Sequence, residues 1–258
     1  MSLKSSLHNN NMNSNNINYI DTHCHLDLYK DPEDIIRKAK ADHTHIVAVT
    51  NLPSVYKREV KMYKAENVTL SLGLHPQLVK EYSHEIDLFL ELLPDTKFLG
   101  EVGLDYQETD ETLKKKQKSI FEKILSECAR YKNKILTVHS RRSSEDVVSM
   151  IGADFPGTII LHWYSGSIST LNKALALGCL FSINPAMTLS KSGQSIINAV
   201  PIERILTETD GPFTNTNKKI SDPSDVIFVI NYLAKLHGKT SDEVREKVKT
   251  NLLECLKK

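Results

Sequence analysis

The fold is decided first by the stretch YIDTHCH, residues 19–25, in which a short β-branched run leads directly into two histidines. An open, doubly wound sheet would carry a glycine-rich GxGxxG phosphate loop after its first strand. This stretch contains no glycine and has nothing in common with such a loop. We therefore favour a closed barrel over the open sheet.

Outward from this stretch, short apolar runs alternate with stretches of helical period along the chain. The runs are almost continuously apolar, as expected of parallel strands that are buried on both faces. Eight strand–helix units over about 240 residues predict a TIM-like (β/α)8 barrel, an α/β fold with one domain over residues 19–258. The predicted strands are Tyr19–Thr22, Ile46–Thr50, Val68–Leu72, Phe98–Val102, Ile135–Val138, Thr158–Leu161, Leu180–Ile183 and Ile205–Thr207. The predicted helices are Pro32–Ala41, Val55–Ala65, Glu85–Leu93, Glu111–Tyr131, Ser144–Ala153, Ile168–Leu177, Gln194–Ala199, Pro223–Leu236 and Ser241–Leu256.

The composition is that of a soluble globular protein. The 258 residues include 33 Lys and Arg against 32 Asp and Glu, so the net charge is +1. A balance this close to zero gives no broad field that would imply a nucleic-acid partner, although a local basic groove stays compatible with it. No apolar run approaches the ~18 residues of a membrane-spanning helix, so we expect no membrane partner.

The first 18 residues and the four cysteines indicate the cellular setting of the protein. Residues 1–18 contain seven Asn and no apolar core of a signal peptide, which predicts a disordered leader outside the fold. The four cysteines lie far apart and form no CxxC pair. They are expected to be buried free thiols in a reducing, cytoplasmic setting.

Polar residues gather where the predicted strands end, which is where a barrel of this type carries its active site. These residues are five of the ten histidines (His23, His25, His75, His139 and His162) and the carboxylates Glu101, Glu208 and Asp210. His23 and His25 are two apart on an extended chain, so both rings leave the same face and can converge on one ion. Cys24 then points the other way and is expected to be a buried thiol.

Six of these residues form a set of nitrogen and oxygen donors without a thiolate, which suits Zn, Mn or Mg. They are His23, His25, Glu101, His139, His162 and Asp210. Six donors exceed what one tetrahedral ion requires, so the set predicts two divalent ions with Glu101 as the bridging carboxylate.

Five motifs resemble the signatures of the TatD family of metal-dependent deoxyribonucleases, in family order. They are YIDTHCHLD (19–27), GLHP (73–76), GEVGLDY (100–106), TVHSR (137–141) and ETDGP (208–212). The resemblance implies a TIM-like barrel of the amidohydrolase type that hydrolyses phosphodiester bonds at a divalent-metal centre. It implies the same six metal ligands, with His75 and Glu208 as further polar positions of the site.

Departures from the family pattern indicate a narrower group. Gln77 stands where the family usually has a second His after the proline, and Trp163-Tyr164 replaces the usual Cys-Phe. Together with the stretch GCLFSINPAM (178–187), these residues resemble the QatD proteins, the TatD-like component of the Qat anti-phage defence system. That resemblance implies other Qat defence proteins as partners. Because Gln77 and Trp163 are expected at the barrel mouth, they bear on substrate preference.

The expected roles follow from these positions. His23, His25 and Asp210 are assigned to one ion, His139 and His162 to the other, and Glu101 to both. Asp210 is the preferred proton acceptor for the attacking water and Glu208 an orienting group, with Glu208 as the alternative base.

The substrate is expected to be DNA, single-stranded or at its ends, as for an exonuclease. His75 and Arg141 are candidates for phosphate contacts. Arg142 is either a further phosphate contact or the solvated start of the next helix. Trp163 and Tyr164 either stack on an exposed base or pack the mouth of the barrel.

Two other functions compete with the nuclease. Deaminases and amide or ester hydrolases of amidohydrolase type often bridge their metals with a modified lysine on the fourth strand, where this chain has Glu101. A non-catalytic interaction subunit of a defence complex would be favoured by loss of ligands, yet all six are present.

Overall fold

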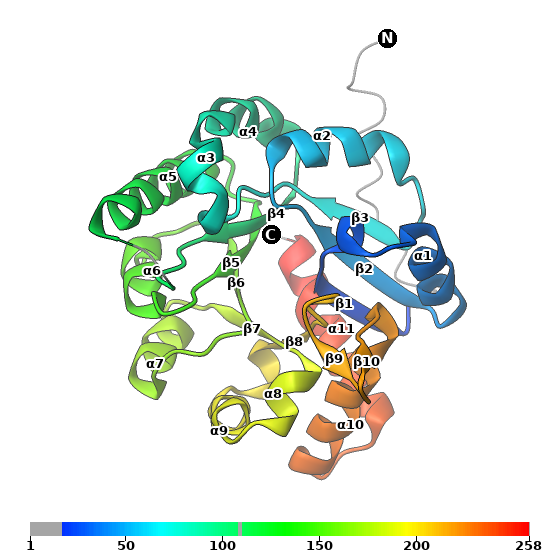
Figure 1. The fold of residues 1–258 in the computed structure, drawn as a ribbon. Helices are drawn as coiled ribbons and strands as arrows, with labels where there is room; N and C mark the ends of the chain where they lie inside the picture. Colours follow the sequence, from blue (N-terminus) through cyan, green and yellow to red (C-terminus); the bar gives the residue numbers. More distant parts are fainter. Residues whose placement is uncertain (1–16, 108–109, 258) are drawn as a thin grey trace.

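A closed barrel of parallel strands, surrounded by helices, forms the molecule (Figure 1). The structure is a computed structural model that describes residues 17–107 and 110–257. One parallel sheet contains β1 (Tyr19–Cys24), β2 (Thr44–Val49) and β3 (Val68–Ser71). The other contains β4 (Phe98–Gly103), β5 (Ile135–His139), β6 (Thr158–His162), β7 (Leu180–Ile183) and β8 (Ile205–Thr207). The predicted (β/α)8 barrel is confirmed.

Two seams join the sheets into a closed barrel. Between β3 and β4, the Leu72 amide donates to Phe98 O at 3.0 Å and the Gly100 amide donates to Leu72 O at 2.7 Å. Between β8 and β1, side chains take part: the Thr22 hydroxyl donates to Thr207 O at 2.9 Å. Closure of the barrel brings the ends of β1 and β8 together, and with them their polar residues.

Most of the helices lie outside the strands and cover their outer face (Figure 1). The helices are α1 (Pro32–Ala41), α2 (Pro53–Met62), α3 (Val79–Tyr82), α4 (Ile86–Leu92), α5 (Glu111–Ala129), α6 (Ser144–Ile151), α7 (Ile168–Ala176), α8 (Pro185–Leu189), α9 (Lys191–Ala199), α10 (Val226–His237) and α11 (Ser241–Lys257). Short 3-10 turns are η3 (Leu26–Leu28), η4 (Pro76–Leu78), η5 (Ser83–Glu85), η6 (Leu93–Asp95), η7 (Ile202–Arg204) and η8 (Pro223–Asp225). A small antiparallel hairpin of β9 (Asn215–Thr216) and β10 (Lys219–Ile220) follows β8.

The element boundaries differ from the predicted ones by a few residues. Helix α2 begins at Pro53 rather than Val55, because proline is well suited to the first helical position, where its missing N–H is not needed. The predicted helix Pro223–Leu236 is a 3-10 turn followed by α10. The hairpin and the separate short helix α8 were not predicted from the pattern.

Helix α11 closes the amino-terminal end of the barrel. A cluster of buried apolar side chains fills this end: Ile20, Val47, Phe98, Ile135, Ile160, Leu180 and Leu206 from the strands, with Leu252 and Cys255 from α11. In Figure 1 this helix lies behind the strands, on the side away from the β9–β10 hairpin. Because apolar side chains fill the amino-terminal end of the barrel, polar groups can meet only at the carboxyl ends of the strands.

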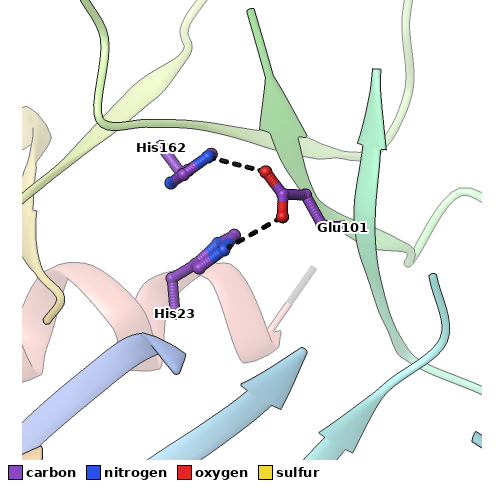
Figure 2. A group of neighbouring side chains, drawn as sticks. All are labelled: His23, Glu101 and His162. Atoms are coloured by element: carbon purple, nitrogen blue, oxygen red, sulfur yellow. Dashed lines mark ion pairs between the residues drawn. The ribbon is translucent and has the colours of Figure 1, made fainter. Parts of the chain in front are cut away.

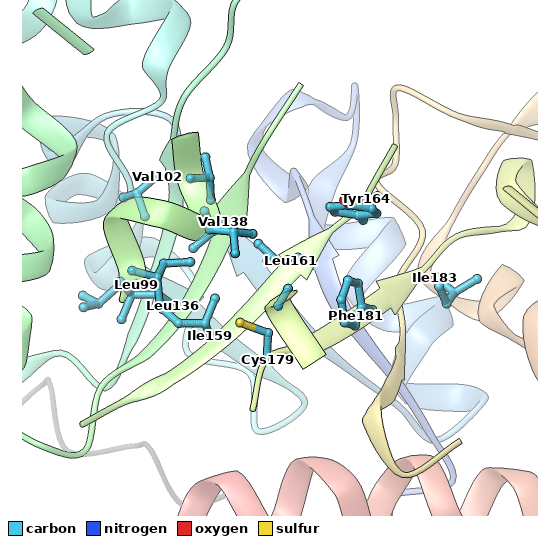
Figure 3. Close-up of a cluster of buried hydrophobic side chains, with 14 of the residues drawn as sticks. Leu99, Val102, Leu136, Val138, Ile159, Leu161, Tyr164, Cys179, Phe181 and Ile183 are labelled. Atoms are coloured by element: carbon cyan, nitrogen blue, oxygen red, sulfur yellow. The ribbon is translucent and has the colours of Figure 1, made fainter. Parts of the chain in front are cut away.

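A second apolar layer lies between the strands and the surrounding helices (Figure 3). Leu99, Leu136 and Leu161 point into it from neighbouring strands and are fully buried. This layer fixes the outward side of each strand, so the alternate residues are held toward the barrel axis.

The last two residues of the predicted leader, Ile17 and Asn18, contact the barrel. Ile17 packs against the cluster at the barrel bottom, and the Asn18 amide donates to His43 O at 2.9 Å. These two residues therefore belong to the barrel: the Ile17 side chain has apolar neighbours there, and the Asn18 amide has a hydrogen-bond acceptor. The other leader residues lie outside the described ranges.

The four cysteines are free and buried, as predicted. Within residues 17–107 and 110–257, no helix is long and apolar enough to cross a membrane.

Candidate metal centre

The predicted metal ligands converge at the carboxyl ends of the strands. They come from the end of β1 and the residue after it (His23, His25), from β4 (Glu101), from the last residues of β5 and β6 (His139, His162) and from the turn after β8 (Asp210). All six are buried or nearly so. Figure 2 shows Glu101 between His23 and His162, with one carboxylate oxygen directed at each ring.

Glu101 faces two different pairs of histidines with its two oxygens. Oε2 lies 3.5 Å from His23 Nε2 and 3.3 Å from His25 Nε2. Oε1 lies 2.6 Å from His139 Nδ1 and 2.8 Å from His162 Nε2. Glu101 therefore lies between two pairs of imidazole nitrogens.

Asp210 joins the first pair. Its Oδ1 lies 3.6 Å from His23 Nε2 and 3.4 Å from His25 Nε2. One donor atom from each of these three residues lies within 4.8 Å of the others, and the same is true of His23, Glu101 and His162. A compact set of imidazole nitrogens and carboxylate oxygens fits a divalent ion such as Zn, Mn or Mg.

His75, predicted as a phosphate contact, lies next to Glu101 and His139. Its Nε2 is 3.4 Å from Glu101 Oε2, and its ring centre is 4.9 Å from that of His139. His75, Glu101 and His139 form a third group that could hold an ion. The structure thus brings His75 next to the six predicted metal ligands. We call these seven residues the donor cluster: His23, His25, His75, Glu101, His139, His162 and Asp210.

The histidines and carboxylates of the cluster shift one another's pKa values. Burial disfavours the charged carboxylate of Glu101, but the surrounding histidines outweigh it and hold its pKa well below the usual value. Burial likewise opposes a charged His25, yet hydrogen bonding to Asp210 and Glu101 raises its pKa to about 9. For His23, burial prevails and lowers the pKa. Without a metal ion, protons on His25 therefore balance part of the carboxylate charge.

Asp105 holds His139 from the side opposite Glu101. Its Oδ2 accepts from His139 Nε2 at 2.8 Å and from Gln77 Nε2 at 2.9 Å. A carboxylate on the far nitrogen of a metal-binding histidine fixes its tautomer and ring orientation. Asp105 is part of the GEVGLDY motif, but sequence reasoning gave it no role; its position two residues after the end of β4 was the available signal.

Glu208 is fully buried and its carboxylate is surrounded by donors. Oε1 accepts from the Trp163 amide at 3.0 Å and from Asn184 Nδ2 at 3.1 Å, and Oε2 accepts from the Ser182 hydroxyl. His162 Nδ1 is 3.6 Å away. These contacts suit an orienting group better than a base that exchanges protons with a substrate.

Of the predicted substrate contacts at the rim, Trp163 and Arg141 are exposed, whereas Tyr164 is buried. Trp163 has an exposed fraction of 37%, and Arg141 is exposed beyond the end of β5. Among the described residues, neither side chain has a hydrogen bond or ion pair with the donor cluster. The stacking alternative for Tyr164 is wrong: its ring is buried against Phe181 (Figure 3), and its hydroxyl donates to Ser167 O at 2.8 Å.

A TIM-type barrel with buried nitrogen and oxygen donors at the carboxyl ends of its strands defines a metal-dependent hydrolase of the amidohydrolase type. More narrowly, the chain belongs to the TatD family: the family model described as TatD related DNase matches residues 20–257.

Relatives of the chain agree with this assignment. The chain is 31% identical over 246 residues to the Escherichia coli K12 protein named uncharacterized metal-dependent hydrolase YcfH, over 88% of this chain and 91% of that one. It is 26% identical over 269 residues to the Homo sapiens protein named deoxyribonuclease TATDN3, over 96% and 97% of the two chains. The crystal structure of YJJV, a TatD homolog from Escherichia coli K12, is similar in fold, with a TM-score of 0.82 at 22% identity over 93% of this chain and 97% of that one.

Proposed function

We propose that this DNase-like hydrolase cleaves phosphodiester bonds in DNA with the help of two divalent metal ions, and that it acts on single strands or ends as an exonuclease. The observation that carries the proposal is Glu101, whose two oxygens face two separate pairs of histidines. Its place on the fourth strand favours the nuclease over hydrolases that use a modified lysine there.

The same residues are proposed as the metal ligands. His23, His25 and Asp210 would hold one ion, and His139 and His162 the other, with Glu101 shared between them. When bound, divalent ions supply Lewis acidity that activates water near neutral pH and offsets the charge that develops on the phosphate oxygens.

The protein's own groups then orient the reactants. Asp210 lies at the edge of the cluster next to His25 and is our choice as proton acceptor from the attacking water. Glu208 keeps His162 and the Trp163 backbone in place. Arg141 would contact a phosphate and Trp163 a base, while His75 would contact either the phosphate or an ion.

A role in anti-phage defence is the narrower part of the proposal. Gln77 and Trp163 support it because they distinguish the chain from the usual family pattern, as in the QatD proteins. We therefore propose that the protein acts with other Qat proteins. The free buried thiols support a reducing, cytoplasmic setting.

A digest of labelled single-stranded DNA, duplex DNA and RNA with Mg, Mn or Zn, and with EDTA as the control, tests the function. We expect metal-stimulated cleavage of DNA, fastest on single strands, and its loss in Glu101→Gln and Asp210→Asn. Absence of cleavage with every metal would overturn the nuclease and favour an interaction subunit. Undiminished cleavage by the Glu101→Gln variant would overturn the assignment of the site.

A further inference from the structure

We propose that the ring of Phe213 is a stacking platform for an unpaired nucleobase next to the bond that is cleaved. This inference rests on the proposed nuclease function and deepens it by assigning a residue that selects single strands. Phe213 follows Asp210 by three residues, in the segment between β8 and the β9–β10 hairpin.

The ring lies directly beside the donor cluster. Its centre is 5.0 Å from the centre of the His25 ring, and the two planes are nearly perpendicular, at 81°. His25 is buried, whereas Phe213 has an exposed fraction of 60%. The Phe213 side chain is therefore largely open to solvent one ring away from a proposed metal ligand, where the nucleotide attached to a bound phosphate would lie.

Folding does not account for the outward orientation of this ring. Along the segment, Phe213 and Asn215 are exposed while Thr214 and Thr216 are buried. An apolar ring faces water and two hydroxyl side chains face the interior, which is the reverse of the usual distribution. A single exposed apolar side chain is common on protein surfaces, so the position of this ring beside His25 is what indicates a ligand contact.

The backbone that carries the ring is held on both sides. The Phe213 amide donates to Asp210 O at 2.9 Å, and the Thr214 hydroxyl donates to Thr209 O at 2.6 Å. The Ser221 amide donates to Thr214 O at 3.0 Å, which ties the segment to the end of the hairpin. Because the main chain is already ordered, binding a base here costs little additional conformational entropy.

A nucleobase is the ligand that fits this surface. A flat apolar face beside a phosphate-cleaving centre is suited to base stacking, which tolerates any sequence because every base has a π-face. In a duplex the bases are stacked on one another and are not available to the ring. Phe213 would therefore favour single strands or frayed ends.

The test compares KM for a single-stranded oligonucleotide with KM for the same oligonucleotide carrying one abasic residue, moved one position at a time. We expect Phe213→Ala to raise KM for the intact strand by roughly 5- to 150-fold, with kcat little changed. At one abasic position the wild type should lose the same factor, and there the substitution should have no further effect. Phe213→Trp should keep the low KM.

Matched controls separate stacking from other roles of the ring. Leu189→Ala removes another exposed apolar side chain, with an exposed fraction of 80%, and should leave KM unchanged. Equal losses in Phe213→Ala on intact strands and at every abasic position would overturn the proposal, since a ring that only shields His25 would act without a base. If the wild type cleaves DNA and Phe213→Ala has an unchanged KM, only the stacking role fails. If the wild type cleaves no nucleic acid, the nuclease function fails and this proposal with it.

Discussion

At the scale of single residues, the contact between Asp105 and His139 makes a prediction about metal affinity. Asp105→Ala removes the carboxylate that lies 2.8 Å from His139 Nε2 and leaves the ring oriented only by its contacts at Nδ1. Loss of such an outer carboxylate typically weakens metal binding by about 10- to 100-fold. Titration of the metal-free protein against a competing chelator would measure the change.

Gln77→Ala is the matched control for this prediction. It removes the donor to Asp105 but leaves the carboxylate on His139, so a smaller loss is expected. Equal affinity in wild type and Asp105→Ala would show that His139 does not need this partner to bind an ion.

Two pairs of residues, His23 with His25 and Trp163 with Tyr164, show what a sequence can and cannot predict about the site. The spacing of His23 and His25 predicted convergence, because alternation along a strand places both rings on one face. Alternation fails at Trp163, whose φ of 37° lies in the left-handed region. This turn puts Trp163 outward and Tyr164 into the core, which a count of residues could not reveal.

At the scale of elements, helix α2 buries a carboxylate against the turn after β1. Glu59 has an exposed fraction of 1%, and its nearest opposite charge is Arg58, whose Nη2 lies 3.5 Å from Glu59 Oε1. Burial, together with the nearby Asp27, raises the pKa of Glu59 to about 7. The charged form is therefore disfavoured in the folded protein.

This pKa predicts a pH-dependent loss of stability. Because the folded pKa lies above the ordinary value of 4.5, the favourable protonated state is retained at low pH and lost as pH rises through about 7. Glu59→Gln cannot ionise, so its stability relative to wild type should improve by on the order of 3 kcal/mol between pH 5 and pH 8. Urea unfolding of both proteins across this range would measure the difference, and parallel curves would contradict the buried charge.

The strands and long helices were predicted from the sequence, whereas the β9–β10 hairpin was not, and the difference has a physical reason. Strands and long helices were recovered because burial on one or both faces imposes a period on the sequence. The hairpin after β8 has no such period: its ordering depends on contacts such as that between the hydroxyls of Thr216 and Ser221, 2.8 Å apart. Predicting it requires the fold first.

At the scale of the whole molecule, the barrel separates stability from chemistry. Helix α11 fills one end with Leu252, and the donor cluster occupies the other. Leu252→Ala should destabilise the fold by about 2–5 kcal/mol, the usual cost of a buried Leu truncation, and leave kcat unchanged below the unfolding transition. Leu189→Ala, at a site with an exposed fraction of 80%, is the control for thermal unfolding. A fall in kcat without a fall in stability would mean that the two ends are coupled.

Metal binding links the site to the stability of the whole barrel. In the metal-free protein, His25 has a pKa of about 9 because Asp210 and Glu101 stabilise its proton. A divalent ion must displace that proton, so its apparent affinity should rise about tenfold for each pH unit between pH 6.5 and 8.5. Since the ion binds the folded state, the unfolding temperature in excess metal should rise further above that in EDTA as pH increases. Calorimetry in buffers of different ionisation enthalpy would count the released protons. An affinity that does not change over this range would mean that His25 has no proton to give up, and the raised pKa of His25 would be wrong.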